Sequence, residues 1–461
     1  MAIRNPHLKF LASLKLAVMI IISLGVVSAV GTITEARFND AEVAQKLVYH
    51  SPYMYGILMV LCINLIAVMV DRWPWRPHHL GFVLAHIGII ILLVGAWITS
   101  KFGVDGSLYF EIGQATRYVQ IKENYLAVFG SLGGEGMQPM HEEPVDFLLS
   151  PPTPEKPYVV PLGKDEIKIV GYYQFAFRES DIVPSQDQRD GPAVRIQLEN
   201  PNVNLTEWIL RDRTRESQDL DLGPAKVILA KSALPPSGRN EIVIVDKPGS
   251  PVLEYKIFNK DKSLRKSGSI RESEFVETGW MGIKFRLLRY LPHAHEMVRY
   301  NELGYATPST TSAMLMQFGG GQERWVGLGI PVRIYFEDRA YVVSFGNRNL
   351  DLGFPLRLKE FRMDRYQGTD RAATYESEVD VPERGDVVIS MNEPLKYKGF
   401  TFYQASFQRD PGTGKPVASI LSVNRDPGRW IKYLGSILIV IGSCVLFWFK
   451  RVQWLKLGNS K

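Results

Sequence analysis

The sequence predicts a membrane protein in which four transmembrane helices, three N-terminal and one C-terminal, are joined to a large all-β extracytoplasmic domain. Two observations predict this fold class. Four apolar stretches of 17 to 21 residues contain no Asp, Glu, Lys or Arg, and each is long enough to cross the hydrocarbon core of a bilayer, which is roughly 30 Å thick. About 330 polar residues separate the third stretch from the fourth. A purely soluble protein is therefore excluded, and so is a compact transporter, because most of its length would lie within the bilayer.

The N-terminal membrane region covers residues 1–100, and residues 429–461 add one span and a short tail. The first apolar stretch is longer than the apolar region of a signal peptide, which has about 7–15 residues. Since the spans that follow need an anchor of fixed orientation, we expect this stretch to be retained as a helix. The four predicted transmembrane helices cover residues 16–33, 52–70, 80–100 and 433–449.

Basic residues gather on one side of the predicted membrane. The segments before the first span, between the second and third spans, and after the fourth span hold nine basic residues and one acidic residue. The link of residues 34–51, on the other side, holds two basic and three acidic residues. The positive-inside rule places the nine basic residues, and with them both termini, in the cytoplasm. The large domain then keeps 41 basic and 44 acidic residues, and such a near balance of charge does not indicate a nucleic-acid-binding surface.

The extracytoplasmic domain, residues 101–428, is predicted to consist almost entirely of short strands. Many short strands with turn signals between them are typical of a sandwich-like fold, here one sandwich or two stacked sandwiches. The proline-rich residues 150–157 are the expected internal boundary. The predicted strands cover residues 107–112, 117–122, 167–175, 193–198, 226–229, 241–245, 252–258, 283–290, 332–336, 341–345, 354–361, 400–407 and 417–423.

Several classes of chemistry are excluded by what the sequence lacks. The two cysteines, Cys62 and Cys444, both lie in apolar stretches, so there is no disulfide framework and the β domain cannot hold a Cys-ligated zinc. The sequence contains no C-x-x-C-H and is therefore not itself a c-type cytochrome. Hydrolase, kinase and metalloprotease motifs are also missing, and no catalytic residue is assigned.

His86 is the most informative single residue, because it lies inside the third apolar stretch, roughly 9 Å below the cytoplasmic surface. Ionisable groups at such depth are rare and usually functional, and a neutral imidazole can ligate a metal. The alternative is a histidine that is hydrogen-bonded to a neighbouring helix. Gly81, Ala85, Gly88 and Gly95 share one face of this helix, which allows another helix to approach closely. His86 flanks that face by about 100°, where a flat ligand could be clamped.

The short cytoplasmic link before this helix is rich in basic and aromatic residues. One interpretation is an aromatic belt with long cationic side chains that reach the interface. The other is an access site for an amphipathic anionic ligand. The residues concerned are Arg72, Trp73, Trp75, Arg76, His78 and His79.

Four segments of the sequence resemble the ResB (CcsB) family of cytochrome c biogenesis proteins. The resemblance covers both ends of the chain and its layout, and it is vague through residues 120–340. The segments are Phe10-Leu-Ala-Ser-Leu-Lys-Leu-Ala with Gly31-Thr32; the Gly81–Gly95 helix with His86; Gly103-x-x-Gly106 with Glu111-x-Gly-Gln114; and Met391-Asn-Glu-Pro-Leu-Lys-Tyr-Lys-Gly-Phe-Thr-Phe-Tyr-Gln-Ala-Ser with Ser422-Val423 and Asp426-Pro427-Gly428.

This resemblance implies delivery of heme across the bacterial cytoplasmic membrane and its assembly onto apocytochrome c. It implies a multi-span, tryptophan-rich partner of the CcsA/ResC type, heme b in transit, and His86 as the intramembrane heme ligand. The chain has no tryptophan-rich segment of that kind, so the partner is not fused to it. A thioredoxin-like protein would supply reductant, since the β domain has no cysteine. The chain is then a non-catalytic or shared subunit of a holocytochrome c synthase complex.

The C-terminal motif is predicted to form a hairpin near the outer membrane face. Its role is either a contact with the partner or a purely internal one. For the whole protein, the alternative function is a membrane-anchored β scaffold that holds apocytochrome or the partner without binding heme. A membrane redox enzyme is a third reading, for which no cofactor signature is present. The motif residues singled out are Asn392, Pro394, Leu395, Gly399, Tyr403 and Gln404.

Overall fold

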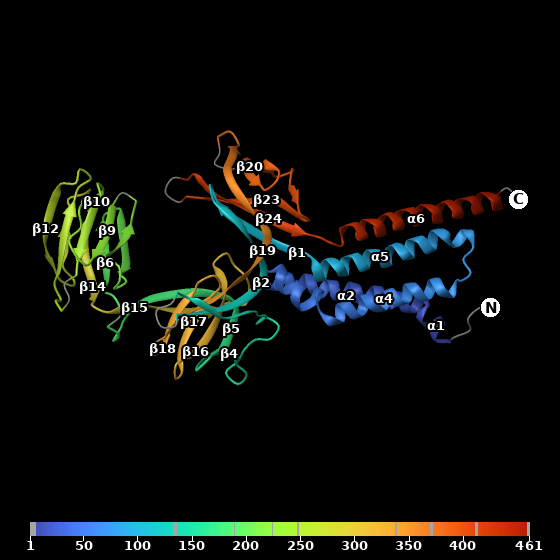
Figure 1. The fold of residues 1–461 in the computed structure, drawn as a ribbon, viewed down its shortest axis with the longest axis horizontal. Coiled ribbons are helices and arrows are strands. Elements are labelled where there is room, and N and C mark those ends of the chain that lie inside the picture. The colour runs from blue at the N-terminus through green and yellow to red at the C-terminus, as the bar shows by residue number, and fades with distance from the viewer. Residues whose placement is uncertain are drawn as a thin grey trace. The chain divides into compact units, whose positions relative to one another are not determined.

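The predicted fold class is confirmed by the computed structural model, which contains three N-terminal and one C-terminal apolar helices and a large multi-sheet β region (Figure 1). The four long helices are α2 (Leu14–Phe38), α4 (Pro52–Asp71), α5 (Leu80–Phe102) and α6 (Arg429–Gly458). All four are long and apolar enough to span a membrane. The structure describes residues 6–131, 136–188, 190–223, 225–246, 249–336, 339–368, 372–410 and 414–458.

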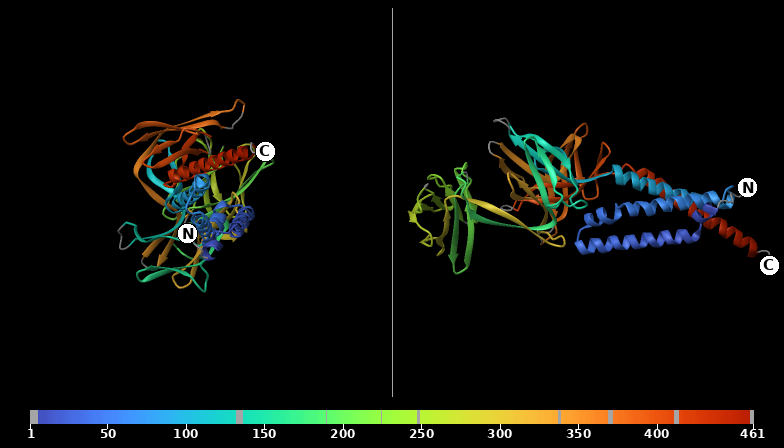
Figure 2. Two further views of the ribbon diagram at one scale, coloured as in Figure 1. Left: turned by 90° about the vertical axis from the view of Figure 1, so that its right-hand side faces the viewer. Right: turned by 90° about the horizontal axis from the view of Figure 1, so that it is seen from below.

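The N-terminal helices begin where serine side chains can cap them. The hydroxyl of Ser13 accepts a hydrogen bond from the Leu16 backbone N–H at 3.2 Å, and Ser51 caps α4 in the same way, with a proline in the first turn of α4. The short elements α1 (Pro6–Leu11), α3 (Ala41–Ala44), η1 (Gln45–Tyr49) and η2 (Pro77–His79) complete the helical region. The start of α1 and the end of α6 lie at the same end of the helices (Figures 1 and 2).

A seam of glycines joins α5 to α6. Three glycines of α5, spaced by seven residues, face two glycines of α6 and the glycine just before it, which have the same spacing, so the two helices run antiparallel in close contact. A Cβ atom built on Gly88 would lie 2.7 Å from the Gly435 carbonyl oxygen, and one on Gly442 would lie 2.5 Å from the Ala85 nitrogen. The expected close approach of another helix is therefore confirmed, and that helix is α6. The facing pairs are Gly81 and Gly442, Gly88 and Gly435, and Gly95 and Gly428.

The chain divides into two compact units. Unit 1 contains residues Met1–Ala176 and Glu302–Lys461, and unit 2 contains Phe177–Asn301. The proline-rich residues 150–157 lie inside unit 1, so the internal boundary expected there is wrong. The chain passes between the units through strands β5 and β15 rather than through a proline-rich linker.

Unit 1 holds a ten-stranded sheet in the order β21-β20-β19-β2-β1-β24-β23-β22, with β18 beside β19 and β3 beside β2. This sheet curls on itself, because β21 also contacts β22 and β23. Its two ends enclose a core that includes Phe110, Leu356 and Phe402. The strands are β1 (Val104–Glu111), β2 (Ala115–Ser131), β3 (Gln138–Pro144), β18 (Val332–Phe336), β19 (Arg339–Arg365), β20 (Ala372–Val381), β21 (Gly385–Ser390), β22 (Leu395–Tyr397), β23 (Phe400–Arg409) and β24 (Pro416–Arg425).

A second sheet of five strands has the order β15-β5-β16-β17, with β4 beside β5. Strands β4, β16 and β17 belong to unit 1, whereas the chain crosses from one unit to the other within β5 and β15. This sheet shares a core with the far ends of β2 and β19, where Ile167 and Met314 pack with Val128 and Phe345. The strands are β4 (Tyr158–Leu162), β5 (Asp165–Pro184), β15 (Ala294–Glu302), β16 (Thr310–Phe318) and β17 (Gln322–Gly327).

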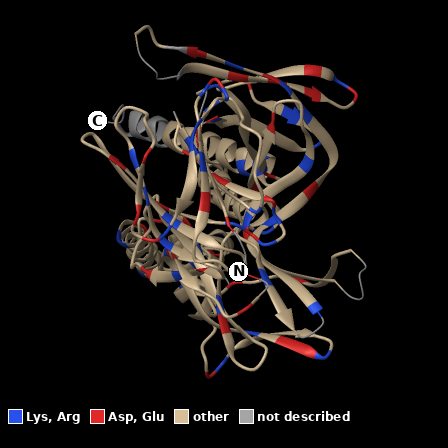
Figure 3. Ribbon diagram, turned by 90° about the vertical axis from the view of Figure 1, so that its left-hand side faces the viewer, with Lys and Arg blue, Asp and Glu red and all other residues tan. Residues whose placement is uncertain are grey.

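Unit 2 is a two-sheet sandwich, in agreement with the predicted architecture. One sheet has the order β12-β11-β10-β9-β8 and the other β13-β14-β6-β7, and one apolar cluster containing Ile196, Leu229 and Phe285 draws on both. Acidic and basic residues are interspersed over the β strands (Figure 3). The strands are β6 (Ala193–Asn200), β7 (Val203–Leu210), β8 (Ser217–Asp221), β9 (Ala225–Ala230), β10 (Asn240–Val245), β11 (Leu253–Phe258), β12 (Leu264–Ile270), β13 (Phe275–Glu277) and β14 (Lys284–Leu291).

Candidate functional site

The imidazole of His86 is held by its own helix. Its Nδ1 atom lies 2.8 Å from the carbonyl oxygen of Phe82, one turn earlier in α5. A carbonyl oxygen can only accept, so Nδ1 must carry the proton and donate it. In a neutral imidazole this leaves the lone pair on Nε2. The half-buried His86 side chain therefore offers a nitrogen lone pair in a fixed tautomer, which is what metal ligation requires.

A phenylalanine that the sequence analysis missed connects His86 to a cation. The ring of Phe82 lies 3.8 Å from the imidazole, centroid to centroid, and the guanidinium carbon of Arg72 lies 3.9 Å from the centroid of the same phenyl ring. Cations at this distance are attracted to the ring face. The spacing of four residues between Phe82 and His86 puts both on one face of α5. This spacing is the feature of the sequence from which the contact could have been predicted.

The other link residues gather at the start of α5. His78 and His79 contact each other with ring centroids 4.1 Å apart, and the backbone N–H of Arg76 donates to His79 Nδ1 at 3.3 Å. The exposed rings of Trp73 and Trp75 pack edge to face 5.0 Å apart. The structure thus brings Arg72 beside the Phe82–His86 pair. It places Arg76, His78 and His79 immediately before α5, where a helix N-terminus favours anions.

At the opposite end of α5, an aspartate ties the helix to α6. The hydroxyl of Thr99 donates to Asp426 at 2.6 Å, and the ammonium of Lys432 donates to the other carboxylate oxygen at 2.8 Å. Burial opposes ionisation of this carboxyl, but these two hydrogen bonds outweigh it and lower the pKa of Asp426 below its ordinary 3.8. Next to this junction β1 pairs with β24, from Val104 opposite Arg425 onward. Both helices therefore enter the ten-stranded sheet as neighbours.

The C-terminal motif forms the predicted hairpin. Strand β22 turns into β23 through Lys398 and Gly399, whose φ angles are 46° and 83°, and Tyr397 pairs with Phe400 across the turn. Two central residues with positive φ make a type I′ turn, which suits the twist of paired strands. Thr401 pairs with Asn424, so the turn lies beside the last residues before α6. This is the edge of the sheet nearest the membrane helices.

The six motif residues have different surroundings within that hairpin. Gln404 is 7% exposed and accepts a hydrogen bond from the Ser377 hydroxyl at 2.7 Å, while its amide donates to Ser419 at 3.1 Å. Tyr403 is 38% exposed and Leu395 is buried. Asn392 and Gly399 are exposed, and Pro394 is half-buried. Gln404 therefore serves a polar network inside the sheet, whereas Tyr403 and Asn392 are available on the surface.

Comparison with known proteins agrees with the resemblance inferred from the sequence. Residues 332–417 match the model of the ResB-like family, a segment that runs from β18 into β24 and contains the hairpin but not His86. The chain is also 21% identical over 441 residues to Protein NrfI of Wolinella succinogenes, which covers 94% of this chain. The chain spans about a third of the length of that relative, 34%.

Proposed function

We propose that this ResB-like membrane protein acts in cytochrome c biogenesis, where it takes part in delivering heme across the membrane for assembly onto apocytochrome c. The observation that carries the proposal is His86. Its Nδ1 bond to Phe82 leaves Nε2 with a lone pair at intramembrane depth, and such a nitrogen is a suitable axial ligand for heme iron. A purely structural scaffold has no need of an imidazole in this position.

The surroundings of His86 suit the remaining chemistry of heme. The macrocycle is flat and apolar and fits beside the Phe82 ring, whereas its two propionates are anionic. Arg72, Arg76, His78 and His79 stand at the same end of α5, where cations and N–H donors can bind carboxylates. In this proposal heme is cargo, held in transit and passed on, rather than a resident cofactor.

The orientation of the protein follows from the distribution of charge. We place the link before α5 and both termini in the cytoplasm, because basic residues dominate those segments. The β region is then extracytoplasmic, on the side where apocytochrome c receives its heme. In a bacterial cell this is the cytoplasmic membrane.

A second membrane protein completes the pathway in this proposal. A tryptophan-rich partner of the CcsA/ResC type would supply the second axial ligand and attach heme to apocytochrome c, and a thioredoxin-like protein would keep the apocytochrome thiols reduced. The exposed Tyr403 and Asn392, on the hairpin next to the membrane helices, are the residues of this chain that we assign to the partner contact.

The direct test replaces His86 with alanine in the chain co-purified with its partner. Alanine removes the ligand and leaves an apolar residue that a membrane helix tolerates well. We expect normal protein levels, loss of most co-purifying heme in the absorption spectrum, and failure of cytochrome c maturation. His295→Ala is the matched control, since His295 is a half-buried histidine of unit 2, far along the chain from the membrane helices, and this variant should retain heme.

Rescue by a free ligand distinguishes the loss of an iron ligand at His86 from a loss of helix packing. Added imidazole should restore part of the heme content of the His86→Ala protein, because it supplies the missing nitrogen. Full heme content and normal cytochrome c assembly in His86→Ala would contradict the proposal. That outcome would favour the alternative in which the chain is a membrane-anchored β scaffold that does not bind heme.

A further inference from the structure

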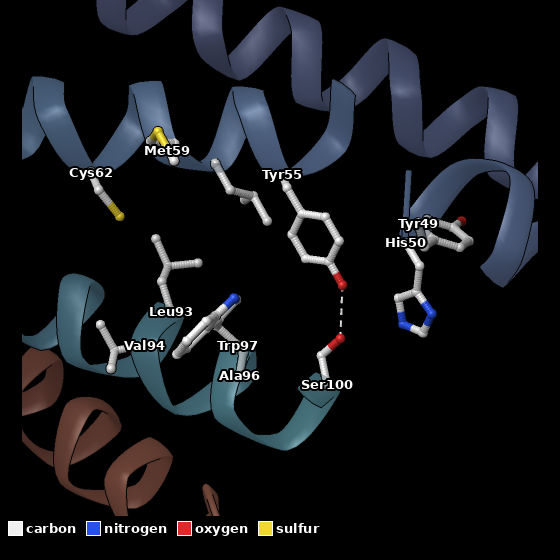
Figure 4. Close-up of a pocket in the computed structure, with 11 residues that line it drawn as sticks. Tyr49, His50, Tyr55, Met59, Cys62, Leu93, Val94, Ala96, Trp97 and Ser100 are labelled. Atoms are coloured by element: carbon white, nitrogen blue, oxygen red, sulfur yellow. Dashed lines mark hydrogen bonds between the residues drawn. The ribbon is translucent and has the colours of Figure 1, made fainter. Parts of the chain in front are cut away.

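A groove of about 460 Å³ lies between α4 and α5, in the half of the helices nearest the β region (Figure 4). Its main part is apolar, with Met59 and Cys62 of α4 across from Leu93, Val94 and Trp97 of α5. The side chains of Met59, Val94 and Trp97 are exposed, so the groove is open along one side. In a membrane this open side faces the hydrocarbon core, and an apolar molecule has to fill it.

The apolar part of the groove ends at a pair of hydroxyls. The side-chain oxygens of Tyr55 and Ser100 are hydrogen-bonded across the groove at 2.8 Å. One hydroxyl donates to the other, which leaves the proton of the accepting hydroxyl for a further acceptor. The exposed His50 lies on the far side of this hydrogen bond. The groove therefore has a continuous apolar part and one polar boundary.

A cation stands next to this boundary. The ammonium of Lys101 lies 5.9 Å from the centroid of the Tyr55 ring, and the Lys101 side chain is exposed. Among the residues that the structure describes, no carboxylate forms an ion pair with Lys101. Lys101 belongs to the last turn of α5, where a long cationic side chain can reach the head groups of a bilayer. This end of the groove thus combines a positive charge with a hydrogen-bond donor.

We propose that the groove binds an anionic phospholipid from the leaflet on the side of the β region. One acyl chain lies in the apolar part, against Met59, Leu93 and Trp97. An ester carbonyl accepts a hydrogen bond from the Tyr55–Ser100 pair, and the phosphate is paired with Lys101. The acyl chain enters through the open side of the groove, so the hydrogen bond between Tyr55 and Ser100 stays intact. This inference does not depend on heme binding at His86.

A phospholipid accounts for the apolar and the polar parts of the groove together. A flexible acyl chain adapts to walls made of large, uneven side chains, whereas a transmembrane helix packs closely where small residues line the contact. The three seam glycines of α5 are already covered by α6. A neutral lipid would fill the apolar part but leave Lys101 without a counter-charge, where an anionic head group supplies one.

The test identifies the lipid that the purified full chain retains. The protein is reconstituted in bilayers of equal phosphatidylglycerol and phosphatidylcholine content and then extracted, and bound lipids are identified by native mass spectrometry. One lysine near the surface should favour the anionic lipid about fivefold. Lys101→Gln should abolish this preference. Arg37→Gln is the matched control and should keep it, because Arg37 is an exposed cation in the last turn of α2, at the same end of the helices.

Ala96→Phe tests the acyl-chain part of the groove separately. Ala96 is exposed and lines the groove, so a phenyl ring there takes the space of the chain and leaves Lys101 in place. This variant should keep its helical circular dichroism and retain one phosphatidylglycerol fewer than the parent.

Three results would overturn the proposal. The first is equal retention of the two lipids by the parent, and the second is the parent's preference persisting in Lys101→Gln. The third is unchanged lipid retention in Ala96→Phe. Loss of the bound lipid when the partner is co-purified would also overturn it, and would assign the groove to a transmembrane helix of that partner.

Discussion

Replacing Gly88 by alanine should destabilise the α5–α6 pair measurably. The added Cβ atom would lie 2.7 Å from the Gly435 carbonyl oxygen and 2.8 Å from the Ile439 backbone nitrogen, about 1 Å inside ordinary van der Waals contact. Both neighbours are backbone atoms, so relief requires the helices to move apart. Overpacking of this kind costs about 1–3 kcal/mol, while the change from glycine to alanine in a helix returns about 0.5–1 kcal/mol.

The net loss should therefore lie between about 0 and 2.5 kcal/mol, with a central value of about 1.3 kcal/mol that changes the unfolding equilibrium about tenfold. Denaturant titration of the purified protein in detergent, followed by helical circular dichroism, measures this loss. Gly25→Ala in α2 and Gly56→Ala in α4 are matched controls, because a Cβ at either position would meet nothing within 4 Å. Those variants should be neutral or slightly stabilised. Equal effects in all three variants would refute the glycine seam as a close contact.

Four further outcomes are expected. The lowered pKa of Asp426 contributes stability at pH values above the unfolded-state pKa, and this contribution is lost as pH falls through the folded-state pKa, below 3.8; thermal scans from pH 6 to 3 should show it, and Asp426→Asn should flatten that part of the profile. Gly399→Ala places a side chain at a φ of 83° and should cost about 1 kcal/mol in thermal or denaturant unfolding. Gln404→Leu removes the partner of two buried serine hydroxyls and should cost about 1–3 kcal/mol, whereas Tyr403→Ala should leave stability unchanged and reduce co-purification of the partner. Tags at residues 1 and 461 should be protected from protease in intact spheroplasts and a tag near residue 200 should be cleaved; the reverse pattern would reject the proposed orientation.

The helices were predictable because the bilayer imposes a length and a composition on them. The observed helices extend a few residues beyond the predicted spans. In α2, for example, the helix starts directly after the capping residue Ser13 and continues to include Arg37 in its last turn. Arg37 lies at the end of the helix, so the helix can be longer than its apolar stretch without placing this charge in the apolar core. The glycine face of α5 was also visible in the sequence. Its partner was not, because helical periodicity shows which face is buried but not which helix covers it.

The β region was predictable in kind but not in organisation. Each predicted strand lies within or overlaps an observed one, yet residues 341–345 and 354–361 belong to the single long strand β19. Strands such as β12 (Leu264–Ile270) and β15 (Ala294–Glu302) were missed, because more than half of the residues in each are polar or glycine and give a weak β signal. The division into two units follows from contacts between residues far apart in the chain, which composition does not encode.

For the candidate site, sequence reasoning identified His86 as the candidate ligand but not the residues that surround it. A histidine in an apolar helix is conspicuous, and so is a basic link beside it. The carbonyl of Phe82 that fixes the His86 tautomer is a backbone atom without a sequence signature.

The pairing of α5 with α6 sets the order in which the protein can be completed. Thr99 and Asp426, which close the junction, are 327 residues apart. A ribosome that adds about 5–20 residues per second needs about 15–65 s to make the intervening chain. During that time α5 is already in the bilayer with its glycine face uncovered, and β1 lacks the neighbour β24 that lies beside it in the sheet. Any truncation before residue 429 therefore leaves the membrane helix that carries His86 without its permanent neighbour, however complete the β region may be.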